Sequence, residues 1–167
     1  MNTIMLNTIG LDGGVVIKKG GGGGKPPIPS IPNDEVWYTT TDGNTISPSV
    51  NNAFGVSIVS NTYVNGKGVF KLSGEATELK DYALQNIAQL SSITIPSSVR
   101  SLGFRAFAYN SSLTSIYIKK DTPPTSYQAF DGLASGCKIY VPIGAREAYI
   151  AATNWSDVAE IIEEANF

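Results

Sequence analysis

The residue types that carry most enzyme chemistry are scarce in this sequence. Histidine is absent, which removes the commonest general base and a common metal ligand. Cys137 is the only cysteine, so the chain has no internal disulfide, no paired-cysteine redox motif and no thiolate zinc site. Any covalent catalysis would have to proceed without a Cys–His or Ser–His pair. We therefore expect Cys137 to be a structural thiol rather than a nucleophile.

The glycine run Gly20–Lys25 is superficially similar to a phosphate-binding loop. Lys19 stands where the first glycine of that loop belongs, and Pro26 stands where Ser or Thr would bind magnesium. Prolines follow the run instead of a helix, so we interpret it as a linker and predict no nucleotide site.

The densest acidic group before the C-terminus is formed by Glu75, Glu78 and Asp81. Paired carboxylates could serve a glycosidase, but polar side chains are also the default on a solvated turn between two repeat elements. We expect these three acidic residues to lie on a solvated turn. The sequence therefore predicts no catalytic residue, no metal ligand and no cofactor.

Composition and charge limit the kinds of partner that this chain could bind. The net charge is −2 and the sequence pI is about 5.1, so no basic field would recruit nucleic acid or an anionic membrane. The apolar stretch at the N-terminus has no preceding basic residue and is interrupted by Asn and Asp, unlike a signal peptide. No apolar run reaches the roughly 18 residues that a membrane span needs.

Three zones follow from the distribution of glycine and proline. Residues 1–17 are mildly apolar, residues 18–33 form a Gly/Pro linker, and residues 34–167 carry the folding signal. An isolated apolar peptide cannot support a core of its own, so we expect residues 1–17 to dock on another protein. The predicted docking residues are Ile4, Leu6, Ile9, Leu11, Val15, Val16 and Ile17.

An internal repeat of 23 residues organises the third zone. Ala83, Ala106 and Ala129 fall in register, and a pair of apolar residues with one residue between them recurs in every copy. These pairs are Phe70 and Leu72, Ile93 and Ile95, Ile116 and Ile118, and Ile139 and Val141. One copy cannot bury its apolar side alone, whereas stacked copies can, so the repeat predicts a short solenoid of parallel strands. The predicted core is Ile93, Ile95, Leu102, Phe107, Leu113, Ile116, Ile118 and Phe130.

The ends of such a stack need caps. Upstream, residues 36–46 predict a β-hairpin cap around Asp42-Gly43 or Gly43-Asn44. Downstream, residues 145–152 and 157–164 predict a helical cap, with Ser156 as the N-cap of its second helix. Trp37 and Trp155 lie near opposite ends, where a large ring could close the core.

The residue between two inward positions of a strand faces outward. This rule predicts an outward row of Lys71, Thr94, Tyr117 and Tyr140, with Lys138 beside it. Neighbouring exposed tyrosines form an amphipathic platform for a sugar or a protein. The alternative, which the residues alone favour, is that tyrosine is simply a good cross-strand neighbour and binds no ligand.

The repeat resembles the BspA-like leucine-rich-repeat family over residues 35–162. The resemblance rests on residues 90–107, with Ile93-Thr-Ile95-Pro96, Leu102-Gly103 and Ala106-Phe107, and on the ending with Asn154-Trp155-Ser156. It implies a leucine-rich-repeat solenoid of the α/β class and a surface-exposed binding module without catalytic residues.

The N-terminal tail is similar in layout to the docking peptide of a virion appendage of Bacteroidetes phages. That similarity implies a virion-surface adhesion protein, bound to a capsid or tail protein and presenting its repeats to a host-surface protein or glycan. A bacterial cell-surface adhesin is the alternative, and a homo-oligomer is compatible with either.

Overall fold

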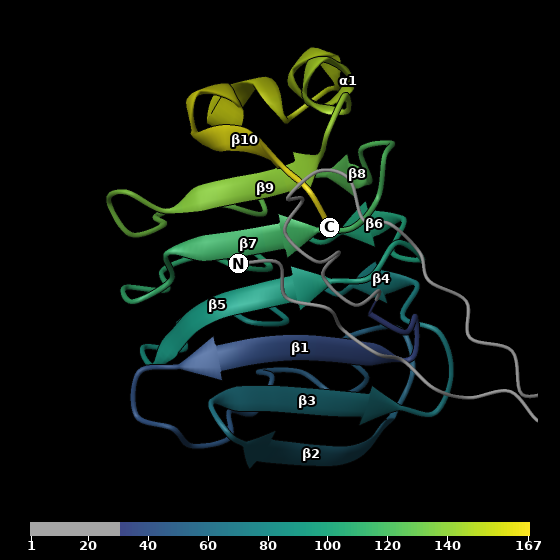
Figure 1. Cartoon of the computed structure of the whole chain (residues 1–167), viewed down its shortest axis with the longest axis vertical. Coiled ribbons are helices and arrows are strands. Elements are labelled where there is room, and N and C mark those ends of the chain that lie inside the picture. The colour runs from purple at the N-terminus through teal and green to yellow at the C-terminus, as the bar shows by residue number, and fades with distance from the viewer. Residues whose placement is uncertain (1–30) are drawn as a thin grey trace, which may run out of the picture.

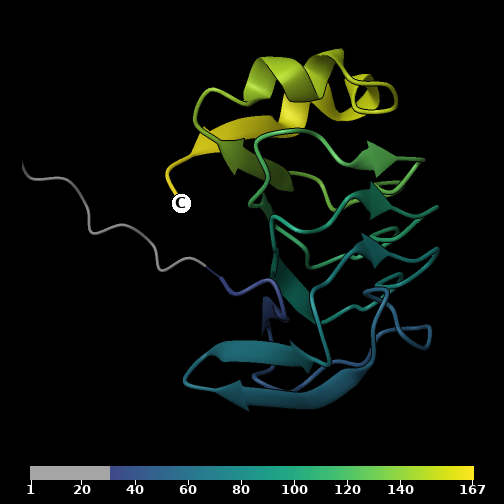
Figure 2. The ribbon, with the colours of Figure 1, turned by 90° about the vertical axis from the view of Figure 1, so that its right-hand side faces the viewer.

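The repeat domain is built from two sheets, because every repeat contains two short extended segments. The computed structural model describes residues 31–167, and Figures 1 and 2 show the long sheet on one side of the solenoid and the short sheet on the other. The long sheet has the order β10-β9-β7-β5-β1-β3-β2, and the short sheet has the order β4-β6-β8.

The strands of the long sheet are β1 (Glu35–Thr40), β2 (Ile58–Val64), β3 (Lys67–Leu72), β5 (Leu90–Ile95), β7 (Ser115–Ile118), β9 (Lys138–Pro142) and β10 (Ile162–Ala165). Those of the short sheet are β4 (Glu78–Leu79), β6 (Ser101–Leu102) and β8 (Thr125–Ser126). The helices are α1 (Arg146–Ala151) and the 3₁₀ helix η1 (Ser156–Ile161). Among the described residues, helices therefore occur only in the C-terminal cap, and the expected α/β character does not extend to the repeats.

The pairing of β5, β7 and β9 confirms the 23-residue register. These strands are parallel, and Ile93, Ile116 and Ile139 lie opposite one another. The apolar sides of the strands face the turns of each repeat, where Ala83, Ala106 and other small residues are fully buried. All eight residues of the predicted core are buried in one cluster: Ile93, Ile95, Leu102, Phe107, Leu113, Ile116, Ile118 and Phe130.

The N-terminal end is capped differently from the prediction. The turn at Asp42-Gly43 forms, with the Asn44 amide donating to the Asp42 carboxylate at 3.1 Å, but it does not connect a hairpin. Strand β1 runs antiparallel between β3 and β5, so both of its edges are already paired. The predicted hairpin is therefore wrong, and the fourth copy of the repeat strand, β3, is separated from β5 by β1.

The hairpin of this cap is instead formed by β2 and β3 around Asn65-Gly66. Both turn residues have positive φ, 50° and 79°, as a two-residue type I′ turn requires. Further along β3, Gly68 faces Tyr38, whose ring occupies the space that a Cβ would need. This close approach lets the buried Tyr38 close the N-terminal end of the core, where Trp37 had been predicted.

The C-terminal cap is only partly helical. Residues 162–165 form strand β10 parallel to β9, so the helix predicted through residue 164 is wrong. Pairing with β9 satisfies backbone groups that a short surface helix would leave to water. Trp155, not Ser156, is the N-cap of η1, and no side-chain capping bond forms. Trp155 is fully buried, as predicted, and its indole N–H donates to the Pro124 carbonyl at 2.8 Å.

One buried polar side chain connects the repeats. Asn110 is fully buried, and its amide donates to the carbonyls of Leu84 at 2.7 Å and Phe107 at 2.8 Å. Its side-chain oxygen accepts from the Ile87 amide at 2.7 Å. Asn110 thus satisfies three backbone groups, two of which belong to the preceding repeat.

Candidate functional site

The predicted row of outward side chains lies on the outer face of the long sheet. Thr94, Tyr117 and Tyr140 are in register on neighbouring parallel strands. The rings of Tyr117 and Tyr140 are stacked, with centroids 4.9 Å apart and planes 15° apart. All three side chains are half-buried, so the row offers ring edges and hydroxyl groups rather than isolated protruding rings.

Lys138 lies at the margin of this row. Its ammonium is 2.9 Å from the Glu163 carboxylate on β10, and this partner raises the pKa of Lys138. Glu163 is also the neighbour of Tyr140 across the β9–β10 pair. Partial burial, followed by the charge of Glu163, raises the pKa of the Tyr140 phenol, so this hydroxyl remains a neutral hydrogen-bond donor at physiological pH.

Lys71 does not belong to the row. Lys71 lies on β3, and strand β1 lies between β3 and β5. Across the β1–β3 pair, Lys71 is opposite Glu35. Its ammonium is 2.8 Å from the Asp34 carboxylate and 3.3 Å from that of Glu35, and these hydrogen bonds raise its pKa. Lys71 therefore belongs to a separate charged cluster beside the N-terminal cap.

Trp37 takes the place in the row that had been predicted for Lys71. It lies opposite Thr94 across the β1–β5 pair, and its indole N–H donates to Glu35 at 2.7 Å. The ammonium of Lys67 is 4.0 Å from the centre of its ring, within the range of a cation–π contact. The sequence contained a signal for this orientation, because Trp37 alternates with the buried Val36 and Tyr38.

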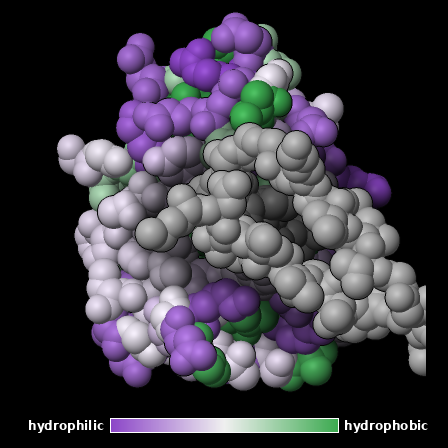
Figure 3. Space-filling view, viewed as in Figure 1, coloured by the Kyte–Doolittle hydropathy of each residue, from purple (hydrophilic) through white to green (hydrophobic). Residues whose placement is uncertain are grey.

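The C-terminus covers part of the row. The ring of Phe167 meets Tyr117 edge-on, with centroids 6.2 Å apart, and the Lys119 ammonium is 4.3 Å from the centre of the Phe167 ring. The side of Tyr140 toward Lys138 and Glu163 has no such aromatic contact among the described residues. The part of this face that is visible in Figure 3 is mainly hydrophilic to neutral, with only small hydrophobic spots.

Residues considered for catalysis occupy local structural roles. Glu75 accepts a hydrogen bond from Asn33 at 3.4 Å, whereas Asp81 accepts one from the Phe104 amide at 2.7 Å. Within residues 31–167, no group of three His, Cys, Asp or Glu side chains is placed to hold a metal ion. No helix in the same range is long and apolar enough to cross a membrane.

Cys137 is buried in the core, and burial raises its pKa to about 11. We expect a thiol reagent at about pH 8 to modify the native chain at least about 100-fold more slowly than the urea-unfolded chain, because the thiolate is the reactive form. Stopped-flow absorbance with a chromogenic disulfide measures both rates. Equal rates in the two states would contradict the structural role of this thiol.

The predicted docking residues Ile4, Leu6, Ile9, Leu11, Val15, Val16 and Ile17 lie outside the described residues. Most of the linker, residues 18–30, also lies outside them. The last residues of the linker contact the repeat domain. Ile31 is buried, and the Asn33 carbonyl accepts a hydrogen bond from the Ala76 amide at 2.8 Å.

The stack of short parallel strands, with caps at both ends and polar rows on its outer face, defines a repeat solenoid of the kind that serves as a binding scaffold. Residues 58–151 match the BspA type leucine rich repeat region, in six copies. Since the match covers more than half of the chain, the chain belongs to this family, whose repeats are typically non-catalytic binding modules. No curated protein matches the chain.

Proposed function

We propose that this chain is a non-enzymatic adhesion protein of a phage virion, in which residues 1–17 dock on a capsid or tail protein and the repeat domain contacts the host. The row of Trp37, Thr94, Tyr117 and Tyr140 would contact a host-surface protein or glycan. The observation that carries the binding role is the in-register aromatic row on the outer face of the solenoid.

Several properties of this row suit recognition. Tyrosine and tryptophan contribute a large contact area at a low cost in side-chain entropy, and their polar atoms add directional hydrogen bonds. Lys138 and Glu163, 2.9 Å apart, provide one charge of each sign at its margin. The row lies on a sheet whose strands are fixed by backbone pairing, so little ordering would be needed on binding.

The virion role is supported by the sequence of the N-terminal zone. Seven aliphatic residues and one acidic residue, Asp12, precede a run of five glycines. A docking site would remove those aliphatic side chains from water, and a glycine linker would accommodate different orientations of the repeat domain. A bacterial cell-surface adhesin is the second candidate, favoured by the family match of residues 58–151.

The test of this function has two arms. The full chain is expected to co-sediment with phage particles in a density gradient, and a chain lacking residues 2–17 is expected to remain at the top. Replacing Tyr117 and Tyr140 by Ala is expected to lower adsorption to host cells at least about tenfold, as for the loss of central contact residues.

The matched control replaces Val59 and Val64 by Ser. These residues are 67% and 62% exposed on β2, away from the row. The control is expected to leave adsorption unchanged. Particle association that survives the deletion would exclude the docking peptide, whereas equal adsorption by both double variants would exclude the aromatic row. Binding to bacterial cells without any particle association would favour the adhesin.

A further inference from the structure

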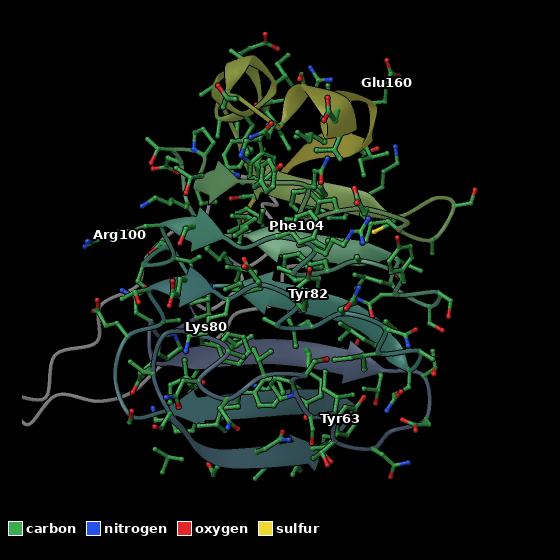
Figure 4. All side chains as sticks on the ribbon, turned by 180° about the vertical axis from the view of Figure 1, so that it is seen from behind. Tyr63, Lys80, Tyr82, Arg100, Phe104 and Glu160 are labelled. Carbon is green, nitrogen blue, oxygen red and sulfur yellow. The ribbon has the colours of Figure 1, made fainter. Side chains whose placement is uncertain are left out.

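A second aromatic surface lies on the opposite side of the solenoid, on the turns that follow the strands of the short sheet. We name it the back patch and define it as Tyr82, Phe104, Arg105, Tyr109 and Tyr127. Figure 4 labels Tyr82 and Phe104 on adjacent turns of this side. Tyr82, Tyr109 and Tyr127 are 39%, 47% and 59% exposed, and they belong to the few exposed large hydrophobic side chains of the described residues.

The rings of the back patch contact one another across three turns. Tyr82 meets Phe104 edge-on, with centroids 5.5 Å apart, and Phe104 lies 5.6 Å from Tyr127 at 34°. The Arg105 guanidinium lies 4.9 Å from the Phe104 ring and 5.7 Å from the Tyr109 ring. The patch is therefore a continuous aromatic strip that runs along the axis of the solenoid.

The backbone under the strip holds these side chains outward at a conformational cost. Tyr82, Arg105 and Tyr109 have φ of 61°, 53° and 60°, in the left-handed region that L side chains rarely adopt. Backbone hydrogen bonds between successive turns fix this conformation, with the Tyr82 amide donating to the Phe104 carbonyl at 2.8 Å. The same conformation recurs at Gln128, with φ of 49°, and at Asn86, with φ of 55°, so it is a feature of each turn of the repeat and fixes where the side chains emerge.

The charge of the back patch favours an uncharged ligand over an anionic one. The only cation within the patch, Arg105, donates to the Asp131 carboxylate at 3.1 Å, so its charge is locally balanced. An anionic ligand would have to compete with this carboxylate. The exposed ring surfaces and tyrosine hydroxyls remain available, and they match the apolar C–H faces and the hydroxyl groups of an uncharged sugar.

We propose that the back patch binds a neutral, linear polysaccharide, whose successive sugar rings pack along Tyr82, Phe104 and Tyr127. A polymer suits this strip better than a single small molecule, because the rings lie side by side along the axis rather than around a cavity. Beside the strip, Arg105 donates hydrogen bonds to the sugar hydroxyls, and the Asp131 carboxylate accepts hydrogen bonds from them. This surface is separate from the outer-face row and does not depend on the N-terminal docking peptide.

The test uses isothermal titration calorimetry of the full chain with cellohexaose, xylohexaose and mannohexaose, and with polygalacturonate as the anionic probe. At least one neutral hexaose is expected to bind, with an affinity that is unchanged between low and high salt. The double variant Tyr82→Gly/Tyr127→Ser is expected to lower that affinity at least about tenfold. Glycine at position 82 accepts the positive φ, so loss of binding would not be a consequence of added backbone strain.

Two further variants separate the explanations. Tyr82→Phe/Tyr127→Phe keeps the rings and is expected to retain most of the affinity, and Val59→Ser/Val64→Ser, at exposed positions of β2, is expected to retain all of it. The proposal is overturned if no neutral hexaose binds, if polygalacturonate binds more tightly in a salt-dependent manner, or if the phenylalanine variant loses as much affinity as the truncated one. It is equally overturned if Tyr82→Gly/Tyr127→Ser binds as the unmodified chain does while Tyr117→Ala/Tyr140→Ala loses binding, a result that would leave the proposed function standing.

Discussion

Replacing Phe107 by Ala is expected to lower the free energy of unfolding by about 3–5 kcal/mol. Phe107 is fully buried and stacks on Phe130 with centroids 5.7 Å apart and planes 3° apart. Phe130 in turn lies 5.2 Å from Trp155, which lies 4.7 Å from Tyr149. Truncating Phe107 therefore opens a cavity at one end of an aromatic series that connects the repeats to the C-terminal cap. A loss of this size is a large part of the stability of an ordinary domain.

Urea unfolding followed by circular dichroism measures this effect. Phe104→Ala is the matched control, because it removes the same atoms from a partly exposed ring three residues earlier. We expect the control to cost less than half as much as Phe107→Ala. Equal losses would show that the aromatic series is not the main connection between the repeats and the cap.

Asn110→Ala is expected to lower the free energy of unfolding by about 3 kcal/mol, since each buried polar group left unsatisfied costs about 1–3 kcal/mol. The substitution removes the partners of the Leu84 and Phe107 carbonyls and of the Ile87 amide. Asn110→Leu would fill the volume better but leave the same groups unpaired, so we expect a similar loss.

The control for this prediction is Asn86→Gly. Asn86 is exposed and has φ of 55°, a conformation that glycine adopts readily. We expect this variant to unfold at the same urea concentration as the unmodified chain or slightly above it. A small effect of both Asn110 variants would indicate that water replaces the amide in the core.

The repeat and the core could be predicted from the sequence because the same short-range pattern recurs in every copy. Residues such as Ile93 and Ile116 need only a neighbour 23 positions away to be buried, and the structure places them opposite each other. The outward row followed from the same alternation, apart from Lys71.

The caps were harder to predict because they depend on pairing between distant segments. Nothing local to Glu35–Thr40 specifies that it will lie between β3 and β5, and this position overturned both the hairpin and the place of Lys71. Asn65-Gly66 is a strong hairpin signal by composition, but it lies before Phe70, the first residue that the repeat pattern covers. Asn110 also had a signal, since it stands in a column with the apolar Ile87 and Leu133.

The last repeat departs from the strict period within the short sheet. Ser101 pairs with Thr125 and Leu102 with Ser126, a shift of one residue relative to the long sheet. Ser126 consequently occupies the inward position that leucine occupies in the preceding copies, and its hydroxyl has no hydrogen-bond partner among the described residues. The sequence repeat is aligned without gaps, so it cannot reveal this one-residue shift. The strands of the long sheet before and after the shift keep their 23-residue spacing.

The antiparallel position of β1 determines how the molecule could change in length. Another parallel strand cannot be added beyond β5, because β1 occupies that edge, and α1, η1 and β10 cover the opposite end. Duplication or loss of a 23-residue unit is therefore compatible with the fold only in the interior, between β5 and β9. Each added unit would lengthen the outer row and the back patch together, so the two surfaces are expected to expand in proportion as such chains diverge.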